Sequence, residues 1–290
     1  MNIYGICALL AGVFWGSVGI FTTPMTAAGV SSSGMMILRC GFAAVCFAVL
    51  LRIKHPGALR FKKKDAPLFL AVGLLGQLCF SLCYYTAIPL VGVSTACILL
   101  YLSPVFVMLL ARILFRDAIG KNGVAALVMS VVGCALVSGF GGTVNVKGVL
   151  CGIGSAVGFA LINVFTRLLI RRGYPGWTVN FYTCVFAVIG GVLLFGLENP
   201  VAYLAGSMGN VVCAVLCGVV NGFLPYIFFS KALSGLESGK VAIFGCTEPV
   251  TAALTGVLLF GEKLTGAGLF GILLVLGGIV LMNRPLGQRK

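Results

Sequence analysis

Residues 103–117, SPVFVMLLARILFRD, and residues 248–262, EPVTAALTGVLLFGE, repeat one pattern 145 positions apart. In both stretches a proline is followed eleven residues later by phenylalanine, and an acid stands two positions beyond it. The offset is half of the 290-residue chain. Identical residues also meet at this offset for Ala87, Ile98, Val105, Leu109, Gly123, Gly133 and Leu136. Recurrence over such a distance predicts a duplicated structural unit.

The composition predicts an all-α integral membrane protein, because 60% of the residues are hydrophobic and only 9% are charged. A hydrocarbon core of about 30 Å is crossed by roughly twenty apolar residues in a helix. Ten such runs can be placed, and the connections between them leave no room for a soluble domain. The predicted spans are 3–22, 34–52, 67–86, 94–115, 119–139, 148–170, 175–197, 209–230, 239–260 and 265–283.

The basic residues predict how these spans are oriented. Fifteen lysines and arginines fall on one side of the predicted membrane: Arg52, Lys54, Arg60, Lys62, Lys63, Lys64, Arg116, Lys121, Arg171, Arg172, Lys231, Lys240, Arg284, Arg289 and Lys290. Only Lys147 and Lys263 fall on the other. The positive-inside rule therefore predicts that both termini are cytoplasmic. The formal charge of +14 is then explained by topology and by contact with anionic membrane lipids, and no nucleic-acid partner is expected.

Five spans in each half predict that the second half enters the membrane from the opposite face. Such inverted repeats around a central cavity are the geometric basis of alternating access in many secondary transporters. Because inverted repeats also occur in channels, a passive channel or facilitator is the alternative. An intramembrane enzyme is disfavoured, because the six acids are dispersed, His55 is the one histidine, and neither an H-E-x-x-H nor a G-x-S-x-G motif occurs.

Glu248 is the sharpest candidate for a functional side chain. It lies about ten residues inside the span 239–260, near the predicted midplane, where a carboxylate costs about 2.5–3.5 kcal/mol on insertion scales. Pro249 removes a backbone donor and predicts a helix break, as Pro104 does in the first half. One interpretation is that Glu248 satisfies the backbone that Pro249 disturbs. We favour the interpretation that Glu248 contacts the substrate or carries a coupling proton. Ser103 stands at the matching position in the first half, so the helix break itself needs no acid.

Polar and aromatic residues on helical stripes extend this candidate site. Taken singly, each is more typical of helix packing, but together they predict a cavity between the first, third, fourth, sixth, eighth and ninth spans. Such a cavity suits small amphipathic molecules. The candidates beside Glu248 are Trp15, Tyr84, Tyr101, Phe159, Asn163, Asn221 and Thr251. On the eighth span the expected stripe is Asn210, Cys217, Asn221 and Pro225.

Three further charged residues have two interpretations each. Arg39 either extends toward the headgroups or acts in gating or in binding a substrate carboxylate. Asp117 and Glu262 either cap the helices that follow them or form gate contacts. The twelve cysteines form no C-x-x-C pair and the chain has no second histidine, so neither a metal nor a cofactor is expected.

Several of these residues together resemble a known family. They are Trp15-Gly16, Arg39, Tyr85-Thr86-Ala87, Pro104, the Phe115-Arg116-Asp117 end and the second run from Glu248-Pro249 to Phe260-Gly261-Glu262. The chain resembles an EamA-type member of the drug/metabolite transporter superfamily, with residues 1–140 and 146–285 as the two repeats. The resemblance implies a ten-helix carrier of the bacterial cytoplasmic (inner) membrane, usually an exporter of amino acids or other metabolites, driven by exchange or a proton gradient. The first copy departs from the pattern at Arg116-Asp117, where the repeat usually reads Gly-Glu.

Overall fold

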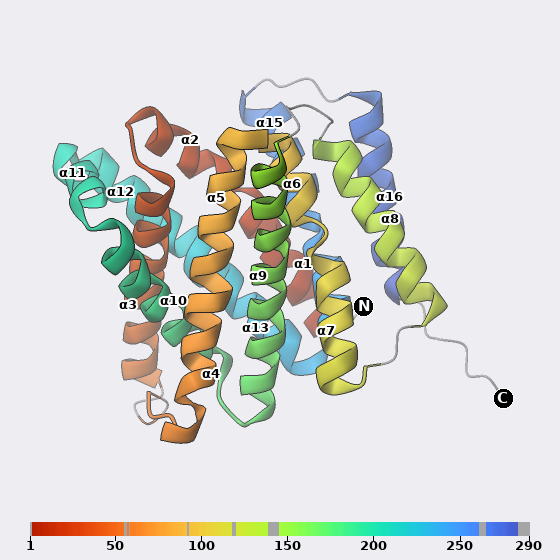
Figure 1. Ribbon diagram of the computed structural model, residues 1–290, viewed down its shortest axis with the longest axis horizontal. Helices are drawn as coiled ribbons and strands as arrows, with labels where there is room; N and C mark the ends of the chain where they lie inside the picture. Colours follow the sequence, from red (N-terminus) through yellow and green to blue (C-terminus); the bar gives the residue numbers. More distant parts are fainter. Residues whose placement is uncertain are drawn as a thin grey trace.

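A computed structural model describes residues 2–54, 57, 59–91, 93–117, 120–138, 145–260 and 265–283. Every regular element among those residues is a helix (Figure 1). The α-helices of the first half are α1 (Ile3–Gly16), α2 (Gly19–Ala27), α3 (Ser32–Lys54), α4 (Ala66–Ala71), α5 (Cys79–Val91), α6 (Val93–Leu100), α7 (Ser103–Phe115) and α8 (Lys121–Ser138). Those of the second half are α9 (Val146–Arg171), α10 (Gly176–Phe195), α11 (Glu198–Gly206), α12 (Met208–Cys217), α13 (Leu224–Gly235), α14 (Ser238–Gly245), α15 (Thr247–Phe260) and α16 (Gly266–Asn283). A 3₁₀ turn, η1 (Lys63–Asp65), precedes α4, and two π-helical segments, η2 (Val72–Leu78) and η3 (Gly218–Phe223), join α4 to α5 and α12 to α13.

Eight helical segments are long and apolar enough to cross a membrane, and they fall on eight of the ten predicted spans. The remaining predictions, 119–139 and 265–283, fall on α8 and α16, which are apolar but shorter. These two helices lie side by side at one edge of the bundle (Figure 1). The chain is therefore a multi-pass membrane protein.

The connection between α10 and α12 differs from the sequence prediction, which had no helix there. Residues 198–206 form α11, whose Pro200 and Tyr203 are buried against the neighbouring helices. The Asn199 side chain accepts a hydrogen bond from Ser31 N at 2.8 Å and donates one to Gly29 O at 3.0 Å. The helix is too short to span, so a search for twenty-residue apolar runs misses it, although Glu198 in its first turn is a typical start signal.

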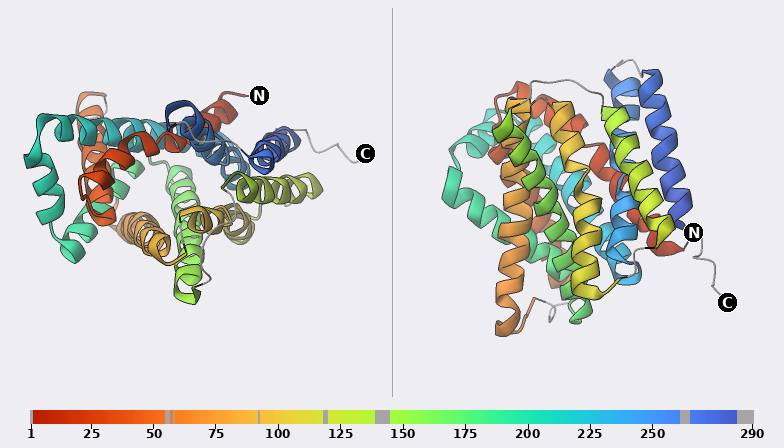
Figure 2. Two further views of the ribbon diagram at one scale, coloured as in Figure 1. Left: turned by 90° about the horizontal axis from the view of Figure 1, so that it is seen from above. Right: turned by 45° about the vertical axis from the view of Figure 1, so that its right-hand side comes forward.

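The first helix of each half packs against the other half. The helix α1 contacts α13, α14 and α15, whereas α9 contacts α5, α6 and α7 (Figure 2). Both helices begin in the same way, since Asn2 accepts from Gly5 N at 3.0 Å and Asn145 from Gly148 N at 3.1 Å. Because α1 packs on the second half and α9 packs on the first, residues of both halves lie next to each other inside the bundle.

A buried acid at the end of η1 links this 3₁₀ turn to the turn between α9 and α10. Asp65 Oδ1 accepts a hydrogen bond from Arg172 at 2.5 Å, and its Oδ2 accepts one from the Tyr174 hydroxyl at 2.6 Å. Tyr174 in turn accepts from Lys62 N at 3.1 Å. Because Asp65 is buried and fully paired, this contact is a structural connection between the two halves.

Candidate functional site

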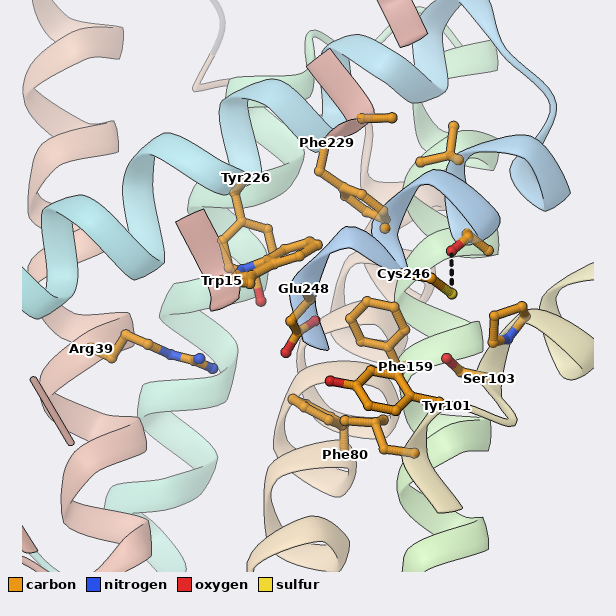
Figure 3. A pocket seen from close by; sticks show the side chains of 16 residues that line it. Trp15, Arg39, Phe80, Tyr101, Ser103, Phe159, Tyr226, Phe229, Cys246 and Glu248 are labelled. Atoms are coloured by element: carbon orange, nitrogen blue, oxygen red, sulfur yellow. Dashed lines mark hydrogen bonds between the residues drawn. The ribbon is translucent and has the colours of Figure 1, made fainter. Parts of the chain in front are cut away.

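A cavity lies between helices from both halves of the chain (Figure 3). The space open to the centres of water-sized molecules is about 60 Å³, room for several waters. Its walls are mostly aromatic and aliphatic, with two charged side chains among them. The lining residues are Ala8, Trp15, Arg39, Phe80, Leu100, Tyr101, Ser103, Pro104, Phe159, Tyr226, Phe229, Val241, Ala242, Gly245, Cys246 and Glu248.

Two interrupted helices border this cavity. The first is interrupted between α6, which ends at Leu100, and α7, which begins at Ser103. The second is interrupted at Cys246, between α14 and α15, and Cys246 lies 145 residues after Tyr101. A proline removes a backbone donor and crowds the carbonyl four residues earlier, which belongs to Leu100 for Pro104 and to Gly245 for Pro249. In both cases the preceding helix ends at that residue. The breaks therefore follow from the prolines, and they place two helix beginnings at the cavity.

Glu248 lies in the first turn of α15 and projects into the cavity (Figure 3). The unpaired backbone N–H groups of a helix start favour a negative charge nearby. The matching position at the start of α7 is Ser103, which also lines the cavity. The starts of α7 and α15 thus carry matching positions of the repeat, and of these two positions only the one on α15 has an acidic side chain.

Arg39 brings a positive charge to the same cavity. Its side chain extends from α3 toward Glu248 (Figure 3). The helix α3 can approach closely because η3 presents glycines to it: a Cβ on Gly218 would lie 3.3 Å from Arg39 O, and one on Gly222 would lie 3.1 Å from it. The cavity therefore contains one carboxylate and one guanidinium, supplied by opposite halves of the chain.

Trp15 is the centre of an aromatic cluster that forms much of the wall. Its ring centroid lies 5.8 Å from that of Phe159, 5.7 Å from Tyr226 and 5.4 Å from Phe229. These separations and steep angles are typical of edge-to-face packing. Phe80 extends the cluster, with its centroid 5.7 Å from that of Phe159. An aromatic wall around two opposite charges can hold a small molecule that has both an apolar part and a charged part.

Comparison with known proteins identifies the family. The EamA-like transporter family matches residues 2–139 and, a second time, residues 146–284. The chain belongs to the EamA-like transporter family. The two matches together cover nearly all of it, so the resemblance predicted from the sequence is confirmed.

Several relatives of this EamA-like protein are themselves named as transporters. The uncharacterized transporter YwfM of Bacillus subtilis (strain 168) is 25% identical over 295 residues, which cover 100% of this chain and 96% of the relative. The uncharacterized inner membrane transporter YicL of Salmonella typhimurium is 26% identical, covering 95% and 93%. The probable glucose uptake protein GlcU of Priestia megaterium is 28% identical, covering 98% of both chains. A crystal structure with 18% identity has the same fold, with a TM-score of 0.84 over 97% of this chain and 96% of the other.

Six of the residues proposed from the sequence line the cavity of this EamA-like transporter. They are Trp15, Arg39, Tyr101, Pro104, Phe159 and Glu248. Three others are used in packing: the Tyr84 hydroxyl lies 2.9 Å from Cys97 Sγ, Thr251 donates to Thr247 O at 3.0 Å, and Asn221 donates to Phe14 O and to Ser17 Oγ. Pro249 lies one position beyond the lining residue Glu248. Glu262 lies outside the described residues.

Asn163 and Asp117 lie off the cavity, toward the end of the bundle where α7 and α9 end. Asn163 is completely buried on α9. Asp117 follows α7, four residues before α8 begins, and its carboxylate pairs with Arg167 of α9. Arg167 also lies 3.5 Å from Ser238 Oγ, at the start of α14. This ion pair joins the two halves.

Tyr226 and Phe229 line the cavity, whereas α-helical spacing on the eighth span predicts Asn221 and Pro225 on that face. The cause is η3, because a π-helical turn contains an extra residue and rotates the following positions by about one residue. A signal was present in the duplication: Tyr84, which was singled out, matches Phe229 at the offset of 145. Phe80 of the third span also lines the cavity and was not proposed, although it lies one helical turn before Tyr84, which was.

The Tyr226 hydroxyl donates a hydrogen bond to Gln77 Oε1. Gln77 lies in η2 and Tyr226 lies just after η3, so this bond connects the two halves of this EamA-like transporter. Changing Tyr226 to phenylalanine is expected to destabilise the fold by about 1–3 kcal/mol, because a buried acceptor loses its donor. Adding Gln77→Leu should recover part of this loss, since both partners are then apolar. Thermal unfolding of the wild type, both single variants and the double variant measures the coupling. If the two losses simply add, the bond contributes nothing.

Proposed function

We propose that this chain is a secondary transporter that moves small amphipathic metabolites by alternating access. The observation that carries the proposal is the cavity, where Glu248 and Arg39 lie among aromatic rings next to two helix breaks. Broken helices beside a binding site at the middle of the membrane are typical of secondary transporters. Charged side chains within spans are rare and mark substrate or ion pathways.

The ten-span, inverted-repeat topology is part of this proposal. Two family matches lie one after the other, and five predicted spans in each half require opposite orientations. The helix breaks and the π-helical segments recur at nearly the same offset, with η2 at Val72–Leu78 and η3 at Gly218–Phe223. The distribution of basic residues supports a cytoplasmic location for both termini. The relative YicL is named as an inner membrane transporter, which supports the same membrane for this chain.

The cavity favours amino acids and other small molecules that carry a charge and an apolar group. Glu248 binds a substrate cation or carries a coupling proton, and Arg39 binds a carboxylate. The aromatic wall contacts the apolar part. Sugars are the second candidate class, because the relative GlcU is named as a probable glucose uptake protein and hydroxyl groups can bond to both charged side chains. Export is the proposed direction, as expected from the family resemblance.

Thermal stabilisation of the purified protein tests the substrate class. A ligand at a hundred times its dissociation constant stabilises the folded state by about 2.7 kcal/mol. Amino acids, glucose and amphipathic amines are compared at equal concentration, and amino acids are expected to stabilise most. Stabilisation by glucose alone would assign the second class.

Transport of the stabilising compound then distinguishes a coupled carrier from a channel. We expect proteoliposomes to accumulate the labelled compound above its external concentration, and we expect an uncoupler to abolish the accumulation. Equilibration without accumulation would support the passive channel or facilitator. Accumulation by everted membrane vesicles, and not by right-side-out vesicles, would establish export.

A further inference from the structure

Apolar residues pack between the cavity and the end of the bundle where α7 and α9 end. Ala242 lines the cavity and packs with Val107 of α7 and Ala160 of α9. The helices α7 and α14 come close here, since a Cβ on Gly239 would lie 2.9 Å from Met108 Cγ. This layer joins one helix of the first half to two helices of the second.

An ion pair lies beyond the apolar layer. The side chains of Arg167 and Asp117 are only 6% and 15% exposed. The Arg167 guanidinium also lies 4.5 Å from the centroid of the Phe115 ring, and Arg171 lies at the same distance from that ring. Ser238 contacts Arg167 from one helical turn before Ala242. The end of α7 is thus held to α9 and α14 by charge and by cation–π contacts.

Asn163 lies between the cavity and this ion pair. It follows the cavity residue Phe159 by four positions on α9 and precedes Arg167 by four, about 6 Å along the helix in each direction. Its side chain is 0% exposed. Neither its Nδ2 nor its Oδ1 has a hydrogen-bond partner in the described part of the chain. A buried amide with no partner destabilises this conformation, so a packing role does not explain it.

We propose that the Asn163 side chain contacts the substrate on its path out of the cavity. In this conformation Asn163 is occluded, and it becomes accessible when Asp117 and Arg167 separate. The inference rests on the proposed function and deepens it. The amide offers a donor and an acceptor, so it suits a substrate hydroxyl, amide or carboxyl group that leaves the cavity. Movement of the first half against the second would separate α7 from α9 and α14, and it would expose Asn163 to that path.

Chemical labelling tests the opening without any knowledge of the substrate. Asn163→Cys is treated with N-ethylmaleimide in the full-length protein, with and without Asp117→Asn. Peptide mass spectrometry measures position 163 separately from the twelve native cysteines. Labelling should be roughly tenfold faster with Asp117→Asn, because removing one partner of a buried ion pair destabilises the closed state. Equal rates in the two backgrounds would overturn the proposal.

Ser130→Cys is the matched control. Ser130 is also 0% exposed and its hydroxyl has no partner in the described residues, but it lies on α8 against Gly278 of α16, away from the ion pair. Its labelling should stay slow in both backgrounds. Faster labelling at both positions would mean that Asp117→Asn loosens the whole protein, and this would also overturn the proposal.

A second variant tests whether the Asn163 amide is structural. Asn163→Leu is expected to unfold at or above the wild-type temperature, because it removes a buried polar group that has no partner. A fall of several degrees would show that the amide stabilises the fold, which contradicts the proposal. Neither measurement requires transport. Failure to transport any compound would therefore reject the proposed function, while the opening that exposes Asn163 could still be measured by labelling.

Discussion

Replacing Glu248 with glutamine is expected to lower the rate of coupled transport by roughly ten- to a hundredfold, the loss expected when a buried charged contact becomes neutral. The carboxylate is the one acidic side chain among the residues that line the described cavity. Glutamine keeps the shape of the side chain, but it can neither carry a negative charge nor take up a proton. The variant therefore tests charge and leaves packing nearly unchanged.

The rate is measured in proteoliposomes with a compound that the wild-type protein accumulates. Thr251→Val is the matched control, since Thr251 lies one turn further along α15 and uses its hydroxyl to bond Thr247 O. It should transport at nearly the wild-type rate. If Glu248→Gln also transports at that rate with the same pH dependence, Glu248 neither binds substrate nor carries a proton.

Replacing Gly16 with alanine is expected to lower the melting temperature by roughly 3–10 °C, from an overpacking cost of about 1–3 kcal/mol. A Cβ at this position would lie 2.4 Å from Glu248 O and 2.6 Å from Thr251 Cβ. The first of these atoms belongs to the backbone next to a helix break, so it cannot be moved by a rotamer change. The expected movement displaces Glu248 and should weaken ligand binding as well.

Gly41→Ala is the control for this substitution. Gly41 lies inside α3, and a Cβ there would meet no atom within 4 Å. Alanine favours a helix interior over glycine by about 1 kcal/mol, so this variant should be as stable as the wild type or more stable. If Gly16→Ala unfolds at the same temperature as Gly41→Ala, α1 does not pack tightly on α15.

Much of the fold could be predicted because the signals are local. An apolar run of about twenty residues identifies a span wherever its neighbours lie, and a proline interrupts its own helix. Eight spans and the interruptions near Pro104 and Pro249 could therefore be placed from the sequence. The helix α11 was missed because it is short, and a nine-residue helix gives no such signal.

The site was predicted less completely, because it depends on how each helix is rotated about its axis. Ideal α-helical spacing placed Asn221 and Pro225 on the cavity face, whereas the π-helical turn before α13 brings Tyr226 there. The contact between Asp117 and Arg167 joins residues 50 positions apart. No local pattern relates them, so Asp117 could be predicted as a helix cap or a gate contact, but Arg167 could not be predicted as its partner.

The sequence by itself determined a duplicated membrane protein with a proline break in each half and an acid beside the second break. These features follow from hydrophobicity, backbone chemistry and repetition, which are properties of short segments. Only the tertiary structure decided that Arg39 faces Glu248, that Trp15 contacts rings from α9 and α13, and that Arg167 forms an ion pair with Asp117. The physical reason is that hydrophobicity fixes which segments enter the membrane, whereas packing between helices fixes their rotation and tilt.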